Sequence, residues 1–160
     1  MKNLVKGSRE KRSDVDKLRT ELLELRARLA KSFSPDTALD GLQGDVPSSG
    51  HCAAAAAIVL ERLGGALISA NVHGISHWFN RVRIDDQLLD LDITGDQFGY
   101  PVVQIKPAEE LYPYTRKRSP DELNDETLHR AALLARRAGL LKAAEALEKR
   151  RQLFQSRPAI

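Results

Sequence analysis

Cysteine is almost absent from this 160-residue chain, in which Cys52 is the single example. An internal disulfide framework is therefore excluded, and the thiol must serve either packing or reactivity. Long hydrophobic runs are also missing, because the longest, from Cys52 to Leu60, has nine residues and covers less than half of a membrane span. The basic N-terminus is followed by no apolar stretch or cleavage site of a signal peptide, so we expect a cytoplasmic protein without a membrane partner.

The sequence also lacks internal repeats, a phosphate-binding loop and a dinucleotide-binding fingerprint, and we expect no cofactor. The net charge of +3 hides an asymmetry: residues 1–31 and 116–160 each carry +5, whereas residues 32–115 carry −7. Because the basic residues of both ends alternate with glutamates on predicted helices, we expect no nucleic-acid partner. The ends are instead suited to dock onto the acidic middle of this chain or of a second copy.

The chain divides into an N-terminal amphipathic helix (1–34), an α+β core (35–115) and a C-terminal helical segment (116–160). In the first segment, apolar residues recur every three or four positions, which predicts a helix from Ser13 to Lys31 with one buried stripe. The stripe consists of Val15, Leu18, Leu22, Leu25 and Leu29.

Two signals organise the C-terminal segment. Ser119 followed by Pro120 and Glu122 predicts a helix start at this point. Gly139 interrupts the apolar periodicity further on, which predicts two helices or one kinked helix.

The core segment combines one helix with short strands. Residues 52–63 are rich in alanine and apolar nearly all round, which predicts a buried helix that Gly64 and Gly65 terminate. Strands are predicted at 66–71, 76–84 and 87–94, and loops at 36–50 and 99–118. The fold class is therefore α+β, with a buried helix on a small antiparallel sheet and flanking terminal helices.

Asp85 and Asp86 predict a two-residue hairpin loop between the last two strands, which places Ile84 opposite Gln87. In this register one face of the hairpin is mostly apolar, whereas the other carries His77 and Asp92 as diagonal neighbours within reach of a hydrogen bond. The apolar face collects Trp78, Val82, Ile84, Leu89, Leu91 and Ile93. The same register predicts a cross-strand ion pair between Arg81 and Asp90.

The order of Cys52, His77 and Asp92 is typical of nucleophilic catalysis, in which a thiolate attacks, an imidazole carries protons and a carboxylate fixes the imidazole tautomer. Cys52 begins the predicted helix, where the free backbone N–H groups favour a thiolate. The Cys52 N–H is a natural oxyanion donor, and the Gln43 amide is a candidate for the second. Supporting roles are assigned to Asn80, Thr94 and Gln97.

Four stretches of the sequence resemble the bacterial YunG-like proteins, over roughly residues 44–98. They are Gly50-His51-Cys52, Gly64-Gly65, Ser76-His77-Trp78-Phe79-Asn80-Arg81 and Asp92-Ile93-Thr94-Gly95-Asp96-Gln97-Phe98. More distantly, the Cys, His, Asp order is similar to the papain-like and transglutaminase-like superfamily, which includes the arylamine acetyltransferases. That resemblance implies a papain-like or transglutaminase-like core in which Cys52, His77 and Asp92 are catalytic. His51 departs from the glutamine expected before the cysteine.

The predicted function is that of a cysteine hydrolase or acyl/amide transferase with a thioester intermediate, acting on a small molecule, peptide or protein. A cluster of aspartates, Asp85, Asp86, Asp90, Asp92 and Asp96, favours cationic or amine-bearing substrates.

Two alternatives use the same sequence differently. The first is a non-catalytic interaction module whose basic helical ends mediate oligomerisation or partner binding. The second is a zinc site formed by Cys52, His51, His73 and His77, although Gly74 interrupts the spacing of the last two histidines. We therefore predict no metal site.

Overall fold

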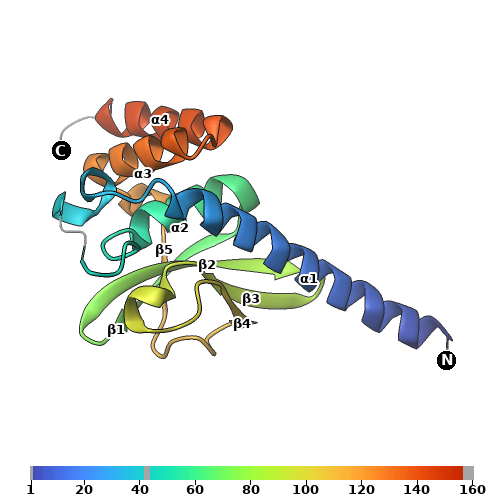
Figure 1. The fold of residues 1–160 in the computed structure, drawn as a ribbon. Helices are drawn as coiled ribbons and strands as arrows, with labels where there is room; N and C mark the ends of the chain where they lie inside the picture. The colour runs from blue at the N-terminus through green and yellow to red at the C-terminus, as the bar shows by residue number, and fades with distance from the viewer. Residues whose placement is uncertain (1, 42–43, 157–160) are drawn as a thin grey trace.

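The structure is a computed structural model that describes residues 2–41 and 44–156, with side-chain environments from residue 14 onwards. Within these residues the chain forms four α-helices and five strands (Figure 1). The helices are α1 (Lys2–Ala30), α2 (Cys52–Leu63), α3 (Asp125–Arg137) and α4 (Leu141–Gln155). The strands are β1 (Ala66–Val72), β2 (Ile75–Ile84), β3 (Gln87–Asp92), β4 (Gln104–Pro107) and β5 (Arg116–Arg118).

The strands form one antiparallel sheet in the order β4-β3-β2-β1-β5, which confirms the α+β class. The predicted hairpin register is also confirmed, since Ile84 pairs with Gln87 and Arg81 with Asp90. β3 ends at Asp92, two residues earlier than predicted, because the chain turns there into the short 3-10 helix η3 (Gly95–Phe98).

The prediction of a loop over residues 99–118 is wrong in part, because β4 and β5 lie within it. Both are short edge strands of four and three residues. β5 consists of Arg116, Lys117 and Arg118, so no alternation of apolar and polar residues marks it. Backbone pairing with the buried strand β1 holds it in place.

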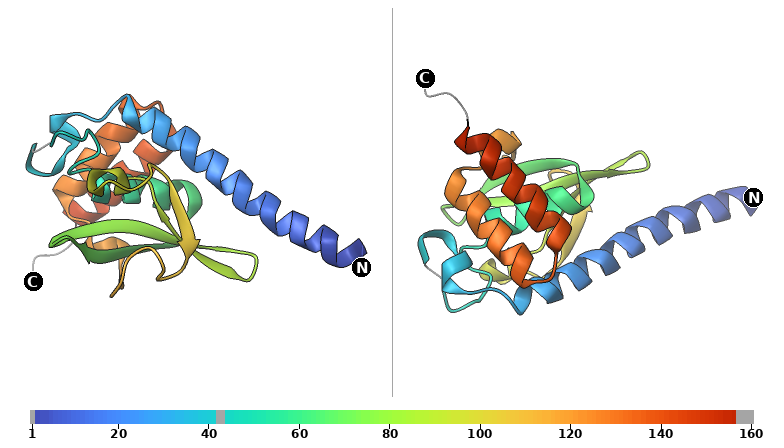
Figure 2. Two further views of the ribbon diagram at one scale, coloured as in Figure 1. Left: turned by 60° about the horizontal axis from the view of Figure 1, so that its bottom comes forward. Right: turned by 90° about the horizontal axis from the view of Figure 1, so that it is seen from above.

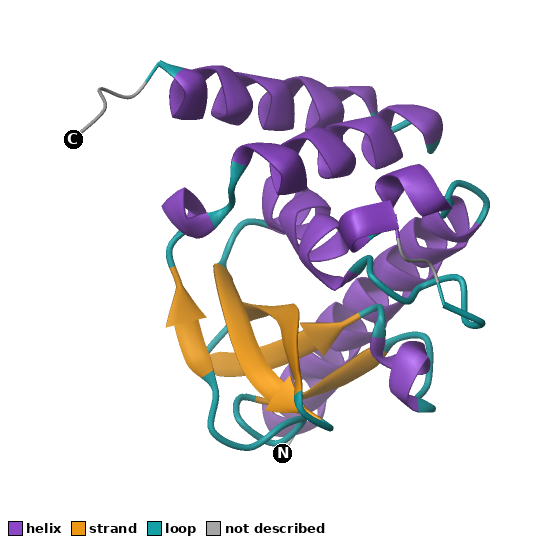
Figure 3. Ribbon diagram, turned by 90° about the vertical axis from the view of Figure 1, so that its left-hand side faces the viewer, coloured by secondary structure: helices purple, strands orange, loops and turns teal. Residues whose placement is uncertain are grey.

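The helices α2, α3 and α4 lie on one side of the sheet (Figures 1 and 3). α2 packs directly on the sheet, and its residues 54–60 are buried. Gly64 ends this helix with a positive φ of 71°, as predicted. α3 and α4 pack on α2 from the side away from the sheet (Figure 3).

α1 contributes its leucine stripe to the same core, and Leu18, Leu22, Leu25 and Leu29 are buried as predicted. Its predicted start at Ser13 is wrong, because the helix begins at Lys2. The N-terminal half extends away from the rest of the molecule (Figures 1 and 2). The second half of α1 is stabilised by packing on the core, and the helix can therefore continue through the polar N-terminal residues despite the cap-like Ser13.

The C-terminal segment also differs from its predicted start. Ser119 caps only one 3-10 turn, Pro120–Glu122, and α3 begins later, after the N-cap Asn124. Gly139, with a φ of 78°, separates α3 from α4, so of the two predicted alternatives the structure has two helices rather than one kinked helix.

Ion pairs connect the basic ends to the acidic middle of the chain. Arg26 of α1 binds Asp96, Arg137 of α3 binds Asp36, and Arg150 of α4 binds Glu61. Basic residues of both ends of the sequence thus form ion pairs with acidic residues of the middle of the same chain. Over the described part of the chain, no helix has the length and apolar character needed to span a bilayer.

The opposite face of the sheet carries a second, smaller hydrophobic cluster. Its buried members are Ile68, Ala70, Val72, Phe79 and Tyr112. Tyr112 belongs to residues 108–115, which connect β4 at one edge of the sheet to β5 at the other. This crossover therefore brings a distant part of the chain onto the face that holds His77 and Asp92.

Candidate active site

Cys52 is the first residue of α2 and is half-buried. Its sulfur lies 4.0 Å from the carbonyl oxygen of Ser76 at the start of β2. The backbone N–H groups in the first turn of a helix have no acceptor within the helix. The sulfur therefore lies between the N-terminus of α2, with its free N–H groups and the positive end of the helix dipole, and the beginning of β2.

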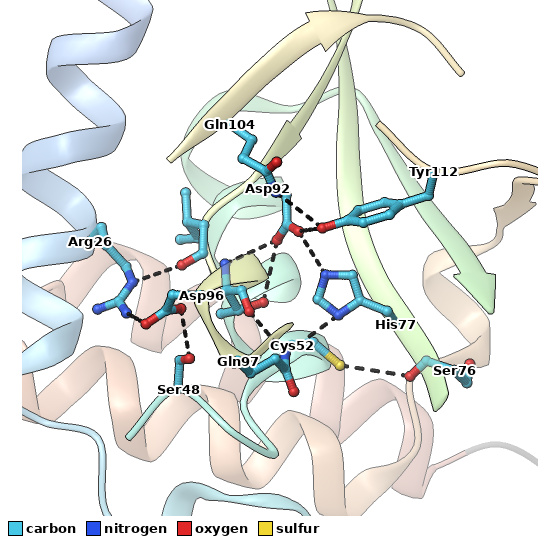
Figure 4. A network of polar contacts seen from close by, with 12 residues as sticks. Arg26, Ser48, Cys52, Ser76, His77, Asp92, Asp96, Gln97, Gln104 and Tyr112 are labelled. Atoms are coloured by element: carbon cyan, nitrogen blue, oxygen red, sulfur yellow. Dashed lines mark hydrogen bonds and ion pairs between the residues drawn. The ribbon is translucent and has the colours of Figure 1, made fainter. Parts of the chain in front are cut away.

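His77 and Asp92 are joined by a hydrogen bond of 2.8 Å between Nε2 and Oδ2, and both side chains are buried. The contact that the hairpin register predicts is thus present. β3 ends at Asp92, so no strand residue of β3 pairs with His77, and η3 lies beside the ring instead (Figure 4).

The other ring nitrogen of His77, Nδ1, faces Cys52 and Gln97 (Figure 4). The Gln97 amide nitrogen lies 3.5 Å from Nδ1 and donates to the carbonyl of Thr94 at 3.0 Å. Burial lowers the pKa of His77, but hydrogen bonds and charge interactions with Asp92 and Cys52 outweigh this and raise the pKa to about 9. The raised pKa favours the imidazolium form of His77, whose ring lies between the Asp92 carboxylate and Cys52.

Asp92 accepts hydrogen bonds at both carboxylate oxygens. The Thr94 backbone N–H donates to Oδ1 at 2.9 Å, and the Thr94 hydroxyl lies 3.4 Å from the same oxygen. The Tyr112 hydroxyl donates to Oδ2, which also accepts from His77, and the Gln104 amide donates to Tyr112 Oη at 3.1 Å. This set of donors gives each oxygen of the buried carboxylate a hydrogen-bond partner.

Gly95 packs against this group without room for a side chain. A Cβ at this position would collide with the Gln104 amide and would lie 2.9 Å from Asp92 Oδ2 and 3.0 Å from Tyr112 Oη. The glycine is required here by close approach rather than by backbone conformation.

A second polar network ties the site to α1 (Figure 4). Arg26 donates from Nε to the Ile93 carbonyl and from a terminal nitrogen to Asp96, each at 2.7 Å. Asp96 also accepts from the Ser48 hydroxyl at 2.7 Å, and Ser48 lies in the loop before Cys52. The network therefore joins α1, η3 and the segment that leads into α2.

The remaining predicted site residues lie at different distances from the reacting groups. Asn80 is on the α2 side of β2, where it donates to the Ala56 carbonyl at 2.9 Å and fixes α2 on the sheet. Thr94 and Gln97 contact Asp92 and His77 as described above. Gln43 lies outside the described residues.

His51 is buried, and its ring packs on Phe33 with 4.4 Å between centroids. Nε2 lies 2.7 Å from the Thr37 hydroxyl, and Nδ1 lies 3.1 Å from the Ser49 carbonyl. Burial lowers the pKa of His51, so the ring is neutral and holds the loop before Cys52. Among the side chains of residues 14–41 and 44–156, no three His, Cys, Asp or Glu groups converge as metal ligands would.

The prediction of one acidic cluster is wrong. Asp85 and Asp86 lie at the tip of the β2–β3 hairpin, at the opposite end of β2 from His77. Asp90 is paired with Arg81 at 2.6 Å, as the register predicts, and Asp96 is paired with Arg26. These carboxylates are thus spread over the molecule and mostly neutralised, so they give no argument for a cationic substrate.

Three residues at the site were missed by the sequence reasoning: Arg26, Gln104 and Tyr112. Arg26 lies three positions before Leu29 and four after Leu22, so its place within the buried stripe is a usable signal. Gln104 follows two valines and precedes Ile105, a short run of strand-forming residues. For Tyr112 the sequence carries no comparable signal.

Comparison with known proteins adds one positive finding. The family described as YunG protein matches residues 21–139. That match covers the last third of α1, together with α2, all five strands and α3. The search of curated proteins and that of solved structures give no match. Because the family matches most of its sequence, the chain belongs to the YunG family.

Proposed function

We propose that the protein is a cysteine hydrolase or acyl/amide transferase, with Cys52 as nucleophile, His77 as proton carrier and Asp92 as the residue that orients His77. The observation that carries this proposal is the arrangement of the three side chains. A thiol at a helix N-terminus faces an imidazolium, whose other nitrogen is bound 2.8 Å from a buried carboxylate. An adjacent imidazolium favours the thiolate form of a cysteine.

In the proposed reaction, Cys52 Sγ forms a bond to the carbonyl carbon of an amide or ester. The resulting oxyanion accepts hydrogen bonds from the Cys52 backbone N–H and from a side-chain amide, for which Gln97 is suitably close to His77. The bond to the leaving group then breaks, and His77 gives that group its proton. Water or an amine attacks the thioester, returns a proton to His77 and releases the thiolate.

The helix that carries the cysteine and the neighbouring strands that carry the histidine and aspartate also support a papain-like or transglutaminase-like core. This relationship is part of the proposal and rests on the order and placement of Cys52, His77 and Asp92.

The test is the rate of alkylation of Cys52 by iodoacetamide at mildly acidic pH. The wild type should react at least about tenfold faster than free cysteine, because its thiol is paired with an imidazolium. His77→Ala should remove this advantage, whereas His73→Ala, which changes an exposed histidine of the β1–β2 turn, should keep it. A wild-type rate equal to that of free cysteine, unchanged by His77→Ala, would exclude the proposed chemistry.

The interaction-module alternative has one observation in its favour, the N-terminal half of α1 that extends from the molecule (Figure 2). Beside it, α1 and the β2–β3 hairpin border an open pocket of about 580 Å³, lined by Leu18, Val82 and Ile84 among others. Deleting residues 1–12 should then change the oligomeric state in light scattering. A longer deletion would remove Arg26 and the buried leucines of α1 and would disrupt the core.

A further inference from the structure

The carboxylate of Asp92 has an unequal set of partners at its two oxygens. Oδ1 is bound by Thr94, two positions along the chain, whereas Oδ2 is shared by two side chains from distant segments, His77 and Tyr112. Tyr112 and His77 therefore compete for the electron density of one oxygen atom.

Tyr112 contacts the imidazole as well as the carboxylate. Its ring meets the ring of His77 edge to face, with 5.4 Å between centroids and an interplanar angle of 81°. The tyrosine is buried, with 4 % of its surface exposed, and packs on Phe79 with 5.2 Å between centroids. The hydroxyl and the ring thus restrain both members of the His77–Asp92 pair.

Tyr112 acts on Asp92 as a donor. Burial and the nearby Asp92 carboxylate raise the pKa of its hydroxyl above the usual range, which favours the protonated hydroxyl as the donor. The Gln104 amide N–H donates to Tyr112 Oη at 3.1 Å, so the hydroxyl proton of Tyr112 is left for Asp92. Gly95 gives these groups the space to approach one another.

We propose that Tyr112 is a positioning residue of this site: by sharing Oδ2 of Asp92 with His77, it orients the carboxylate and limits how strongly the carboxylate holds the imidazolium proton. This role deepens the proposed function and rests on it for its catalytic meaning. Hydrogen bonds to an anion spread its charge, and a carboxylate with an additional donor is a weaker partner for a neighbouring cation. Tyr112 thereby keeps His77 able to release its proton to a leaving group.

The groups around His77 that can carry charge come from several elements. They are Asp92 at the end of β3, Cys52 at the start of α2, Tyr112 in the β4–β5 crossover and His73 in the β1–β2 turn, which reaches the site through the Phe98 ring. Removal of the Tyr112 hydroxyl changes only one of them. Removal of the hydroxyl destabilises the state with uncharged His77 more than the state with the imidazolium, because the imidazolium itself compensates the carboxylate charge. The pKa of His77 should therefore rise.

The experiment compares wild type, Tyr112→Phe and the control Tyr100→Phe. Tyr100 is a neighbouring tyrosine, 6.0 Å from Tyr112 between ring centroids and 40 % exposed. The His77 titration is followed by NMR, and the pH dependence of Cys52 alkylation is followed in parallel. Tyr112→Phe should move the His77 titration upward by about one pH unit, with the alkylation profile moving alongside it, whereas Tyr100→Phe should leave both in place.

A folded Tyr112→Phe variant with the wild-type titration would overturn the proposal and leave Tyr112 as a packing residue only. If Tyr112→Phe fails to fold, Gln104→Leu is the second variant. It removes the hydrogen bond that Tyr112 Oη accepts, which weakens the hydroxyl as a donor to Asp92, and it should shift the His77 titration in the same direction by a smaller amount. The NMR readout needs no substrate. Failure of the proposed role of Tyr112 is therefore distinguishable from failure of the proposed thiol chemistry, which the wild-type alkylation rate reports.

Discussion

Nε2 of His77 lies 2.8 Å from Oδ2 of Asp92, and the two residues are 0 % and 2 % exposed. When His77 gives up a proton, a buried carboxylate in this position keeps the remaining proton on Nε2, so Nδ1, which faces Cys52, is the nitrogen that exchanges protons.

Asp92→Asn should lower the reactivity of Cys52, because a neutral amide no longer stabilises the imidazolium beside the thiol. We expect the alkylation rate at mildly acidic pH to fall about tenfold for each unit by which the pKa of His77 drops. Asp90→Asn is a matched control on the same strand and face, since Asp90 is equally buried but is paired with Arg81. Equal rates in the two variants would show that Asp92 has no special relation to Cys52.

The stability of the protein should decrease as the pH rises from about 6.5 to about 9. The pKa of an unfolded histidine is about 6.5, whereas that of His77 in the folded chain is raised to about 9. The folded state therefore binds this proton more tightly, and the stabilisation is complete below the lower value and lost as the pH passes the higher one.

The loss should be on the order of 3 kcal/mol across that window, since one pKa unit corresponds to about 1.4 kcal/mol. Urea unfolding at the two ends of the window measures it. His77→Gln should flatten the dependence, whereas His73→Gln, an exposed position, should retain it. An undiminished slope in His77→Gln would assign the effect to other groups.

Gly95→Ala should destabilise the fold and slow the reaction of Cys52 together, because the new methyl group must displace Gln104, Asp92 or Tyr112. Overpacking of this kind costs about 2 kcal/mol. Gly74→Ala offers a contrast: its Cβ meets open space, and the positive φ of 81° costs about 1 kcal/mol without touching the site. Thermal unfolding and the alkylation rate, measured on both variants, separate collision at the site from backbone strain.

Arg26→Met should destabilise the protein by about 3 kcal/mol, because it leaves Asp96 without its buried cation and the Ile93 carbonyl without its donor. Since Asp96 also holds Ser48, the loop before Cys52 should loosen, and the alkylation rate should fall. Arg28→Met on the exposed side of the same helix is the control and should stay within about 0.5 kcal/mol of wild type. Similar losses in both variants would point to helix propensity rather than to the network.

The central hairpin could be predicted from sequence because its register depends on local chemistry. A two-residue polar loop and the alternation of apolar residues from Trp78 to Ile93 determine which side chains share a face. The contact between His77 and Asp92 and the ion pair between Arg81 and Asp90 follow from that register. The start of α2 at Cys52 was predictable for a similar reason, since alanine-rich composition and a glycine stop are local signals.

The rest of the site depends on contacts between distant segments, which no local pattern encodes. Tyr112 reaches Asp92 only because β4 and β5 occupy opposite edges of the sheet, and the sequence of β5, Arg116–Arg118, has no strand signal. The place of Arg26 within the leucine stripe of α1 indicates burial, but no pattern in that helix predicts its partners, a carbonyl and a carboxylate about 70 residues away. The prediction that the helix begins at Ser13 was wrong because a serine that can cap a helix can also lie inside one, and α1 begins at Lys2.

The crossover between β4 and β5 has a consequence for the order in which the molecule is assembled. Cys52, His77 and Asp92 lie within 41 consecutive positions of the sequence, but Tyr112 follows them and is placed only when β5 pairs with the far edge of the sheet. Contacts that close long loops form late in folding. During refolding, the hairpin and α2 can therefore bring the three reacting side chains together before the tyrosine arrives, so the thiol should acquire its final pH dependence in the last kinetic phase.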